Sequence, residues 1–168
     1  MSGSPVASVV PIAEEHIEGF TAALDSVARE RRYLARFEAP AAEDVRKYVR
    51  ENIAKRVPHF VAVGDGSVIG WCDIARKPQP AFAHSGVLGM GVVSDFRGQG
   101  IGRALLNATL QAAKSIGISR IELTVRVDNE RAKRLYESGG FVVEGLCRGH
   151  MRVDGEFQDS WLMALLHV

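Results

Sequence analysis

The chain has 168 residues, which suits one domain with a single core, and its 46% hydrophobic and 24% charged residues are typical of a globular protein. Lysine and arginine number 21 against 20 acidic residues, so the net charge is +1. This balance gives no electrostatic reason to expect nucleic acid or an anionic membrane as a partner.

The start of the chain and its cysteines exclude further classes. Residues 1–8 carry neither a basic flank nor a long apolar segment, so we predict no signal peptide, no membrane span and a cytoplasmic location. Residues 1–7, rich in Ser, Gly and Pro, predict a disordered N-terminus before a single domain at 8–168. Cys72 and Cys147 lie in separate apolar runs without metal-ligand spacing, so we expect two buried thiols and no metal.

Hydrophobic periodicity and turn residues divide the chain into short elements. In chain order, these are a strand at residues 9–12, helices at 17–27 and 42–57, a hairpin at 60–63 and 68–74, a strand at 87–93, a helix at 101–116, a strand at 121–127, a helix at 131–138 and a last hairpin at 141–152 and 157–166. Pro58 ends the second helix and Gly117 the third. The order βααβββαβαββ predicts an α/β fold, with helices on the faces of a mixed sheet.

The segment RGQGIGR follows a strand and opens a helix. Its alternate glycines let the backbone approach a ligand closely, because no Cβ intervenes. The free amides of the first helical turn would point at that ligand, and the helix dipole favours negative charge there. We therefore predict that this segment binds a pyrophosphate; it comprises Arg97, Gly98, Gln99, Gly100, Ile101, Gly102 and Arg103.

Other phosphate loops fit this segment less well. A Walker A loop needs a Gly-Lys-Ser/Thr ending, which is missing. A dinucleotide fingerprint that starts at Gly98 needs a sixth-position glycine, where Arg103 stands. Glu122 lies about 20 residues past the loop, where such a fold has its ribose-binding acid, so a nicotinamide enzyme stays an alternative. A plain tight turn would explain one or two glycines but not three.

Two motifs resemble the GCN5-related N-acetyltransferase (GNAT) superfamily. Arg97-x-x-Gly100-x-Gly102 matches the superfamily's Gln/Arg-x-x-Gly-x-Gly/Ala signature, and residues 129–141 (NERAKRLYESGGF) look like its Asn-x-x-Ala-x-x-Leu-Tyr-Glu-x-x-Gly-Phe. The resemblance implies the acyl-CoA N-acyltransferase fold, acetyl-CoA as cosubstrate and direct acetyl transfer to a primary amine. The tail (EGxxR from 144, DGxFxD from 154, MAL from 163) is similar to a bacterial branch that acts on amino acids, polyamines or ribosomal protein N-termini.

The resemblance also implies which residues hold the cosubstrate. The backbone of Met90, Gly91 and Val92 would pair with the pantetheine arm as an added strand does, and one of its amides would donate to the thioester carbonyl. Residues 98–103 would wrap the pyrophosphate, with Arg97 or Arg103 adding charge. Glycines within this strand, at positions 89 and 91, suggest a bulge or a close backbone approach.

Two residues of the second motif have both structural and functional interpretations. Asn129 is predicted to cap the helix that follows and also to touch the cosubstrate. The alternative is that it only caps the helix. Tyr136 is predicted to be the general acid, because a phenol with a pKa near 10 suits a thiolate leaving group. On periodicity alone it would be a packed aromatic residue; the motif favours the catalytic role.

The general base is left open by the sequence. Some relatives carry a glutamate five residues before the motif asparagine, but Thr124 stands there and cannot accept a proton. The candidates, each acting directly or through water, are Glu122, Asp73, His84 and Glu38. His84 titrates in the right range, although a loop histidine without a role is equally consistent.

Substrate residues are expected at the junction of the first two helices and in the last hairpin. The candidates are Tyr33, Phe37, Glu38, His84, Arg148 and Asp159. Arg148 either grips a carboxylate bidentately, which would favour amino acids, or is a surface residue.

We expect an enzyme that acetylates a small-molecule amine, most naturally an amino acid, with polyamines or protein N-termini as alternatives. A non-catalytic acyl-CoA-binding module is the alternative from another class. The resemblance also implies a homodimer, without indicating its surface.

Overall fold

The computed structural model describes residues 7–167, in which seven strands form one mixed sheet. The strand order is β1-β2-β3-β4-β5-β7-β6, and neighbours are antiparallel except for the parallel pair β4 and β5. The strands are β1 Ser8–Pro11, β2 His59–Gly64, β3 Ser67–Arg76, β4 Ser85–Val92, β5 Arg120–Arg126, β6 Val142–Val153 and β7 Glu156–Leu166.

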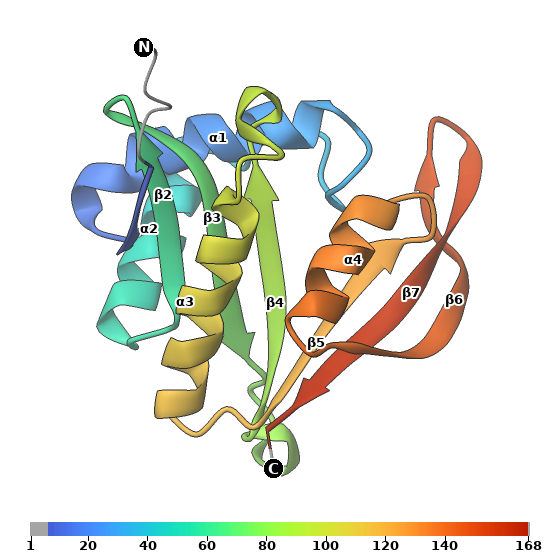
Figure 1. Ribbon diagram of the computed structural model, residues 1–168. Helices are drawn as coiled ribbons and strands as arrows, with labels where there is room; N and C mark the ends of the chain where they lie inside the picture. The colour runs from blue at the N-terminus through green and yellow to red at the C-terminus, as the bar shows by residue number, and fades with distance from the viewer. Residues whose placement is uncertain (1–6, 168) are drawn as a thin grey trace.

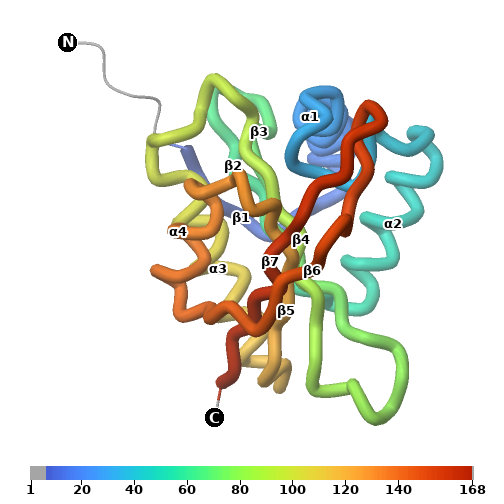
Figure 2. Tube along the Cα trace, turned by 90° about the vertical axis from the view of Figure 1, so that its right-hand side faces the viewer, coloured from blue at the N-terminus to red at the C-terminus, as the bar shows by residue number. Residues whose placement is uncertain are grey.

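Helices cover both faces of this sheet. The side view shows α1 and α2 on one face and α3 and α4 on the other (Figure 2). The helices are α1 Ile17–Arg29, α2 Ala42–Ala54, α3 Ile101–Ser115 and α4 Glu130–Ser138. The predicted order βααβββαβαββ and the mixed α/β architecture are therefore confirmed.

The alternation of side chains along β3 divides the core into two parts. Trp71 faces α1, with its ring centroid 5.7 Å from that of Phe20, whereas Cys72 belongs to the buried cluster that contains Leu105 of α3. Successive strand residues point to opposite faces, so Asp73 shares the α1/α2 face with Trp71. Each helix pair thus buries its apolar stripe against one face of the sheet.

The strands β4 and β5 pair only along their first three residues. Ser85, Gly86 and Val87 lie opposite Arg120, Ile121 and Glu122, and no further pair follows in the described chain. Beyond this point the two strands diverge towards the N-terminal ends of α3 and α4 (Figure 1). The divergence leaves one backbone edge of each strand without a neighbouring strand.

Several local expectations need correction. Helix α2 ends at Ala54 rather than at 57, because Arg56 takes a left-handed φ of 52° that no helix continues. The β3–β4 register is unbroken, so there is no bulge at Gly91; instead a Cβ there would lie 2.4 Å from the Trp71 ring. Cys72 is buried as predicted, but Cys147 is partly exposed.

Three further predictions concern the N-terminus, membrane spans and metal sites. Residues 1–6 of the predicted disordered terminus lie outside the described residues. Between residues 7 and 167, none of the helices has the length and apolar character to cross a membrane. Over the same range, no three His, Cys, Asp or Glu residues are grouped so that they could hold a metal ion.

Candidate functional site

A cavity of about 400 Å³ lies where β4 and β5 diverge. Its lining comes from the end of β4, the glycine loop, the end of β5, the first turns of α4 and the segment between α1 and α2. Of the residues predicted to bind the cosubstrate, eight line it: Met90, Gly91, Val92, Arg97, Gly98, Gly102, Asn129 and Tyr136.

The end of β4 offers this cavity a free backbone edge. One edge of residues 90–92 pairs with β3, and the other faces the gap left by β5. Amide and carbonyl groups on such an edge are strong hydrogen-bonding groups that need a partner. An extended, amide-containing chain can therefore lie along β4 as an additional strand does.

The glycine loop turns the chain from β4 into α3. Gly98 and Gly100 have φ values of 76° and 83°, which only glycine adopts without strain. Gly100 is the N-cap of α3 and has open space where a Cβ would stand, so the free amides of the first turn are accessible there. Gly102 has another role, since a Cβ there would lie 3.2 Å from Leu135 of α4.

The other predicted loop residues contribute less directly. Gln99 donates to the backbone carbonyl of Asp95 at 3.2 Å, and the Ile101 side chain is buried in the core. Arg103 is exposed and is not among the residues that line the cavity. These side chains shape the loop rather than the cavity wall.

Part of the positive charge of the cavity comes from residues that were not predicted from the sequence. Arg131 and Arg134 of α4 line it, and the Arg131 Nη2 atom lies 3.4 Å from the Cβ position of Gly98. Arg97, predicted to add charge, instead donates to the Val92 carbonyl at 2.8 Å and forms an ion pair with Glu30. The run of basic residues inside the second motif was the available signal.

Asn129 caps α4, as predicted, and its contact with the cosubstrate stays a prediction. Its Oδ1 atom accepts a hydrogen bond from the Ala132 amide at 3.2 Å, which caps α4, and the residue also lines the cavity. The cap fixes the helix whose first turns carry Arg131 and Arg134. An anion in the cavity would face these guanidinium groups as well as the first turn of α3.

Tyr136 lies at the inner side of the cavity, packed beside Phe141 at a centroid distance of 5.8 Å. The residue is only 8% exposed. Burial, and secondarily the neighbouring Cys72, raises the pKa of the Tyr136 phenol. The hydroxyl therefore stays protonated at neutral pH and available as a donor, although the raised pKa makes it a weaker acid than the free phenol with a pKa near 10.

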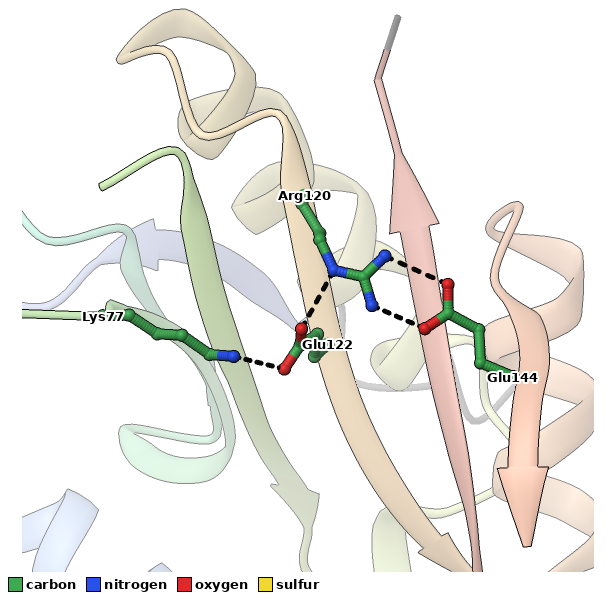
Figure 3. A network of polar contacts seen from close by, with 4 residues as sticks. All are labelled: Lys77, Arg120, Glu122 and Glu144. Atoms are coloured by element: carbon green, nitrogen blue, oxygen red, sulfur yellow. Dashed lines mark hydrogen bonds and ion pairs between the residues drawn. The ribbon is translucent and has the colours of Figure 1, made fainter. Parts of the chain in front are cut away.

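Glu122, one candidate base, is held between two cations. Its carboxylate accepts from Lys77 at 2.6 Å and from Arg120 at 2.9 Å, and Arg120 continues the chain of contacts to Glu144 (Figure 3). The Lys77 hydrogen bond, followed by that from Arg120, lowers the pKa of Glu122. A carboxylate stabilised as an anion in this way is a poor proton acceptor.

The structure does not bring most of the remaining substrate candidates to the cavity. His84 precedes the first residue of β4, roughly 20 Å from Met90 at the usual rise per strand residue. Glu38 is exposed and lies 3.8 Å from Arg29, and Arg148 is exposed on the edge strand β6. The Asp159 carboxylate accepts from the Gly149 amide at 2.7 Å, which is a structural role.

Tyr33 is the one substrate candidate that lines the cavity. It belongs to residues 30–40, the segment between α1 and α2 that we call the strap. The Arg97 guanidinium carbon lies 4.7 Å from its ring centroid, a cation–π contact. Arg32 of the strap also lines the cavity, and Phe37 stacks under Arg31 at 3.8 Å instead.

These features define a protein that holds an extended, amide-containing carrier with a diphosphate at one end. The sequence matches the acetyltransferase (GNAT) family over residues 21–141, and the chain belongs to this family. It is an acetyl-CoA-dependent N-acetyltransferase.

The relatives agree with this assignment. L-amino acid N-acetyltransferase AaaT of Escherichia coli (strain K12) is 32% identical over 118 residues, which cover 68% of this chain and 73% of that protein. N-alpha-acetyltransferase RimI of Mycobacterium tuberculosis is 39% identical over 99 residues, covering 58% and 60%. The structure of yncA from Salmonella typhimurium with acetyl-CoA has the same fold, with a TM-score of 0.89 at 17% identity over 95% of this chain and 93% of that one.

We expect Gly100→Val to weaken acetyl-CoA binding about tenfold or more. A β-branched residue at this φ costs about 1–2 kcal/mol, and the loop can relieve the strain only by turning its amides away. The dissociation constant, measured by calorimetric titration, checks this.

Gly117→Val is the matched control for this change. Gly117 follows the other end of α3 with a φ of 79° and equally open surroundings, so its substitution brings the same strain far from the cavity. Its dissociation constant should stay within about twofold of wild type. Normal binding by Gly100→Val, or equal weakening in both variants, would contradict the loop assignment.

Proposed function

We propose that this chain transfers the acetyl group of acetyl-CoA to the primary amine of a free amino acid or a related small molecule. The observation that carries the proposal is a strap that is fastened by ion pairs and lines the cavity through Arg32 and Tyr33. The similarity to an L-amino acid N-acetyltransferase over two thirds of the chain supports the same class of acceptor.

The strap is fastened to both sides of the cavity. Arg31 donates to the Asp154 carboxylate in the turn between β6 and β7, through Nε at 3.3 Å and also through Nη2. Glu30, at its start, forms an ion pair with Arg97 of the glycine loop, which in turn donates to the Val92 carbonyl at the end of β4. Figure 2 shows this β6–β7 turn beside α1. An acceptor must fit beneath a segment held at these points, which favours a small molecule over a peptide.

We assign the following roles around the thioester that acetyl-CoA supplies. The backbone of residues 90–92 orients the pantetheine arm, and the amides of residues 98–103 hold the diphosphate with Arg131 and Arg134. Tyr136, kept protonated by burial, donates its proton to the departing sulfur. Tyr33 and Arg32 form the wall of the cavity on the side of the acceptor.

A protein N-terminus is the second candidate acceptor. The similarity to N-alpha-acetyltransferase RimI favours it, although it covers less of the chain than the similarity to AaaT does. Polyamines stay as a further alternative acceptor from the sequence, whereas membership of the acetyltransferase family argues against the non-catalytic acyl-CoA-binding role. We also propose that residues 8–168 act as one N-acetyltransferase domain. The homodimer and the cytoplasmic location stay predictions.

An acceptor panel tests the proposed substrate class. Purified protein with acetyl-CoA is offered L-amino acids, a polyamine and a short peptide with a free N-terminus, and thiol release is followed. We expect the highest kcat/KM for one or more amino acids, because the strap leaves less room for a peptide and the relative AaaT acts on L-amino acids. A clear preference for the peptide would move the assignment to protein N-termini, and the absence of thiol release with every compound of the panel would contradict all three proposed acceptor classes.

We expect Tyr136→Phe to lower kcat by roughly 10²-fold or more, because the departing thiolate loses its proton donor. The KM for acetyl-CoA should stay within about twofold, since the ring still packs beside Phe141. Steady-state kinetics with the best acceptor of the panel measure both constants. Unchanged turnover would remove Tyr136 from the mechanism.

A further inference from the structure

Asp73 is a buried carboxylate to which the proposed function assigns no role. It lies on β3 and is only 9% exposed. Tyr48 of α2 donates its hydroxyl proton to the Asp73 Oδ2 atom at 2.6 Å. A buried carboxylate with a single hydrogen bond recorded among residues 7–167 is costly, so its presence calls for a reason.

The second oxygen of Asp73 is directed at the neighbouring strand. Asp73 pairs with Gly89 of β4, and a Cβ on Gly89 would lie 3.5 Å from the Asp73 Oδ1 atom. Gly89 is exposed and has no side chain, so it leaves the Asp73 Oδ1 atom uncovered. Any larger residue would stand between the carboxylate and the space above β4.

The same row of the sheet leads to the cavity. Gly89 and Thr124 each lie two residues beyond the last β4–β5 pair, Val87 with Glu122. Because Leu123 is buried on the α3 side, Thr124 points to the face that Asp73 shares. Thr124 lines the cavity, as does Met90, the residue after Gly89. Asp73 is not itself among the lining residues; it lies one strand away from them, on the face of the sheet that α1 and α2 cover.

We propose that Asp73 accepts the proton of the acceptor amine, with Tyr48 as the residue that positions it. The inference rests on the proposed function. As the nitrogen of the neutral amine forms its bond to the acyl carbon, one N–H proton passes to Asp73 Oδ1, the C–S bond breaks, and the sulfur takes the proton of the Tyr136 hydroxyl. Asp73 then releases its proton to water, and water reprotonates Tyr136.

The electrostatic surroundings of Asp73 suit this role. Burial raises its pKa to about 6, while the Tyr48 hydrogen bond opposes the rise. The groups that face it are Tyr48 and Asn52 of α2 and His59 of β2, and Arg36 of the strap acts on Tyr48. Burial lowers the pKa of His59 to about 4 and raises that of Tyr48. Between about pH 5 and 8, Asp73 is therefore the member of this group that changes charge.

The test is the pH dependence of kcat with saturating acetyl-CoA and the best amino acid of the panel. Asp73 accepts a proton only as the anion, so wild-type kcat should rise with pH through about 6 and then level off. Asp73→Asn should lower kcat roughly 10²-fold and abolish this limb, with the KM for acetyl-CoA within about twofold. Tyr48→Phe removes the hydrogen bond that lowers the pKa, so the limb should move to higher pH.

Glu122→Gln is the matched control, because Glu122 is a carboxylate on the same face that two cations already hold. Its kcat, and the pH at which its kcat rises, should stay close to those of the wild type. The melting temperature of Asp73→Asn at pH 8 should not fall below that of wild type, which carries a buried anion there. A purely structural Asp73 would predict a fall.

The outcomes separate the two proposals. Wild-type turnover in Asp73→Asn, or an unshifted limb in Tyr48→Phe, would overturn the role of Asp73 and leave the proposed function standing. Absence of thiol release by the wild type with every amine would overturn both. Should Asp73→Asn fail to fold, the shift in Tyr48→Phe decides alone.

Discussion

The site depends on two parallel strands that pair for three residues and then part. A sheet normally satisfies the backbone groups of a central strand on both edges, so the divergence leaves polar groups of β4 and β5 facing a gap. The same divergence makes room for the cavity and brings the first turns of α3 and α4 to its outer end (Figure 1). Backbone recognition of an extended carrier and anion binding at helix N-termini thus follow from one feature of the sheet.

Charges around this gap are divided between structure and binding. Arg97 is used to fasten the strap to β4 through Glu30, whereas Arg131 and Arg134 face the cavity. Glu122 is neutralised by Lys77 and Arg120. Asp73 has no cationic partner among residues 7–167, and burial raises its proton affinity. The pairing of each charge therefore indicates whether it is available for chemistry.

Local signals in the sequence predicted the elements and the glycine loop. Apolar periodicity, Asp-Gly turns and the alternate glycines each act within a few residues, and the observed order and the φ of Gly100 agree with them. The roles of charged side chains were harder to predict because they depend on contacts between distant segments. Arg97 meets Glu30 across 67 residues, and the environment of Asp73 follows from the β3–β4 register. The proximity of His84 to the start of β4 could not reveal that the cavity lies at the other end of that strand.

The central claim is that acetyl-CoA lies in the gap between β4 and β5, held by backbone groups. Hydrogen exchange of individual amides, measured by NMR with and without acetyl-CoA, tests it most directly. We expect acetyl-CoA to slow exchange of the amides at residues 90–92 and 98–103 by more than it slows exchange elsewhere. Protection concentrated on another surface, with these amides unchanged, would contradict it.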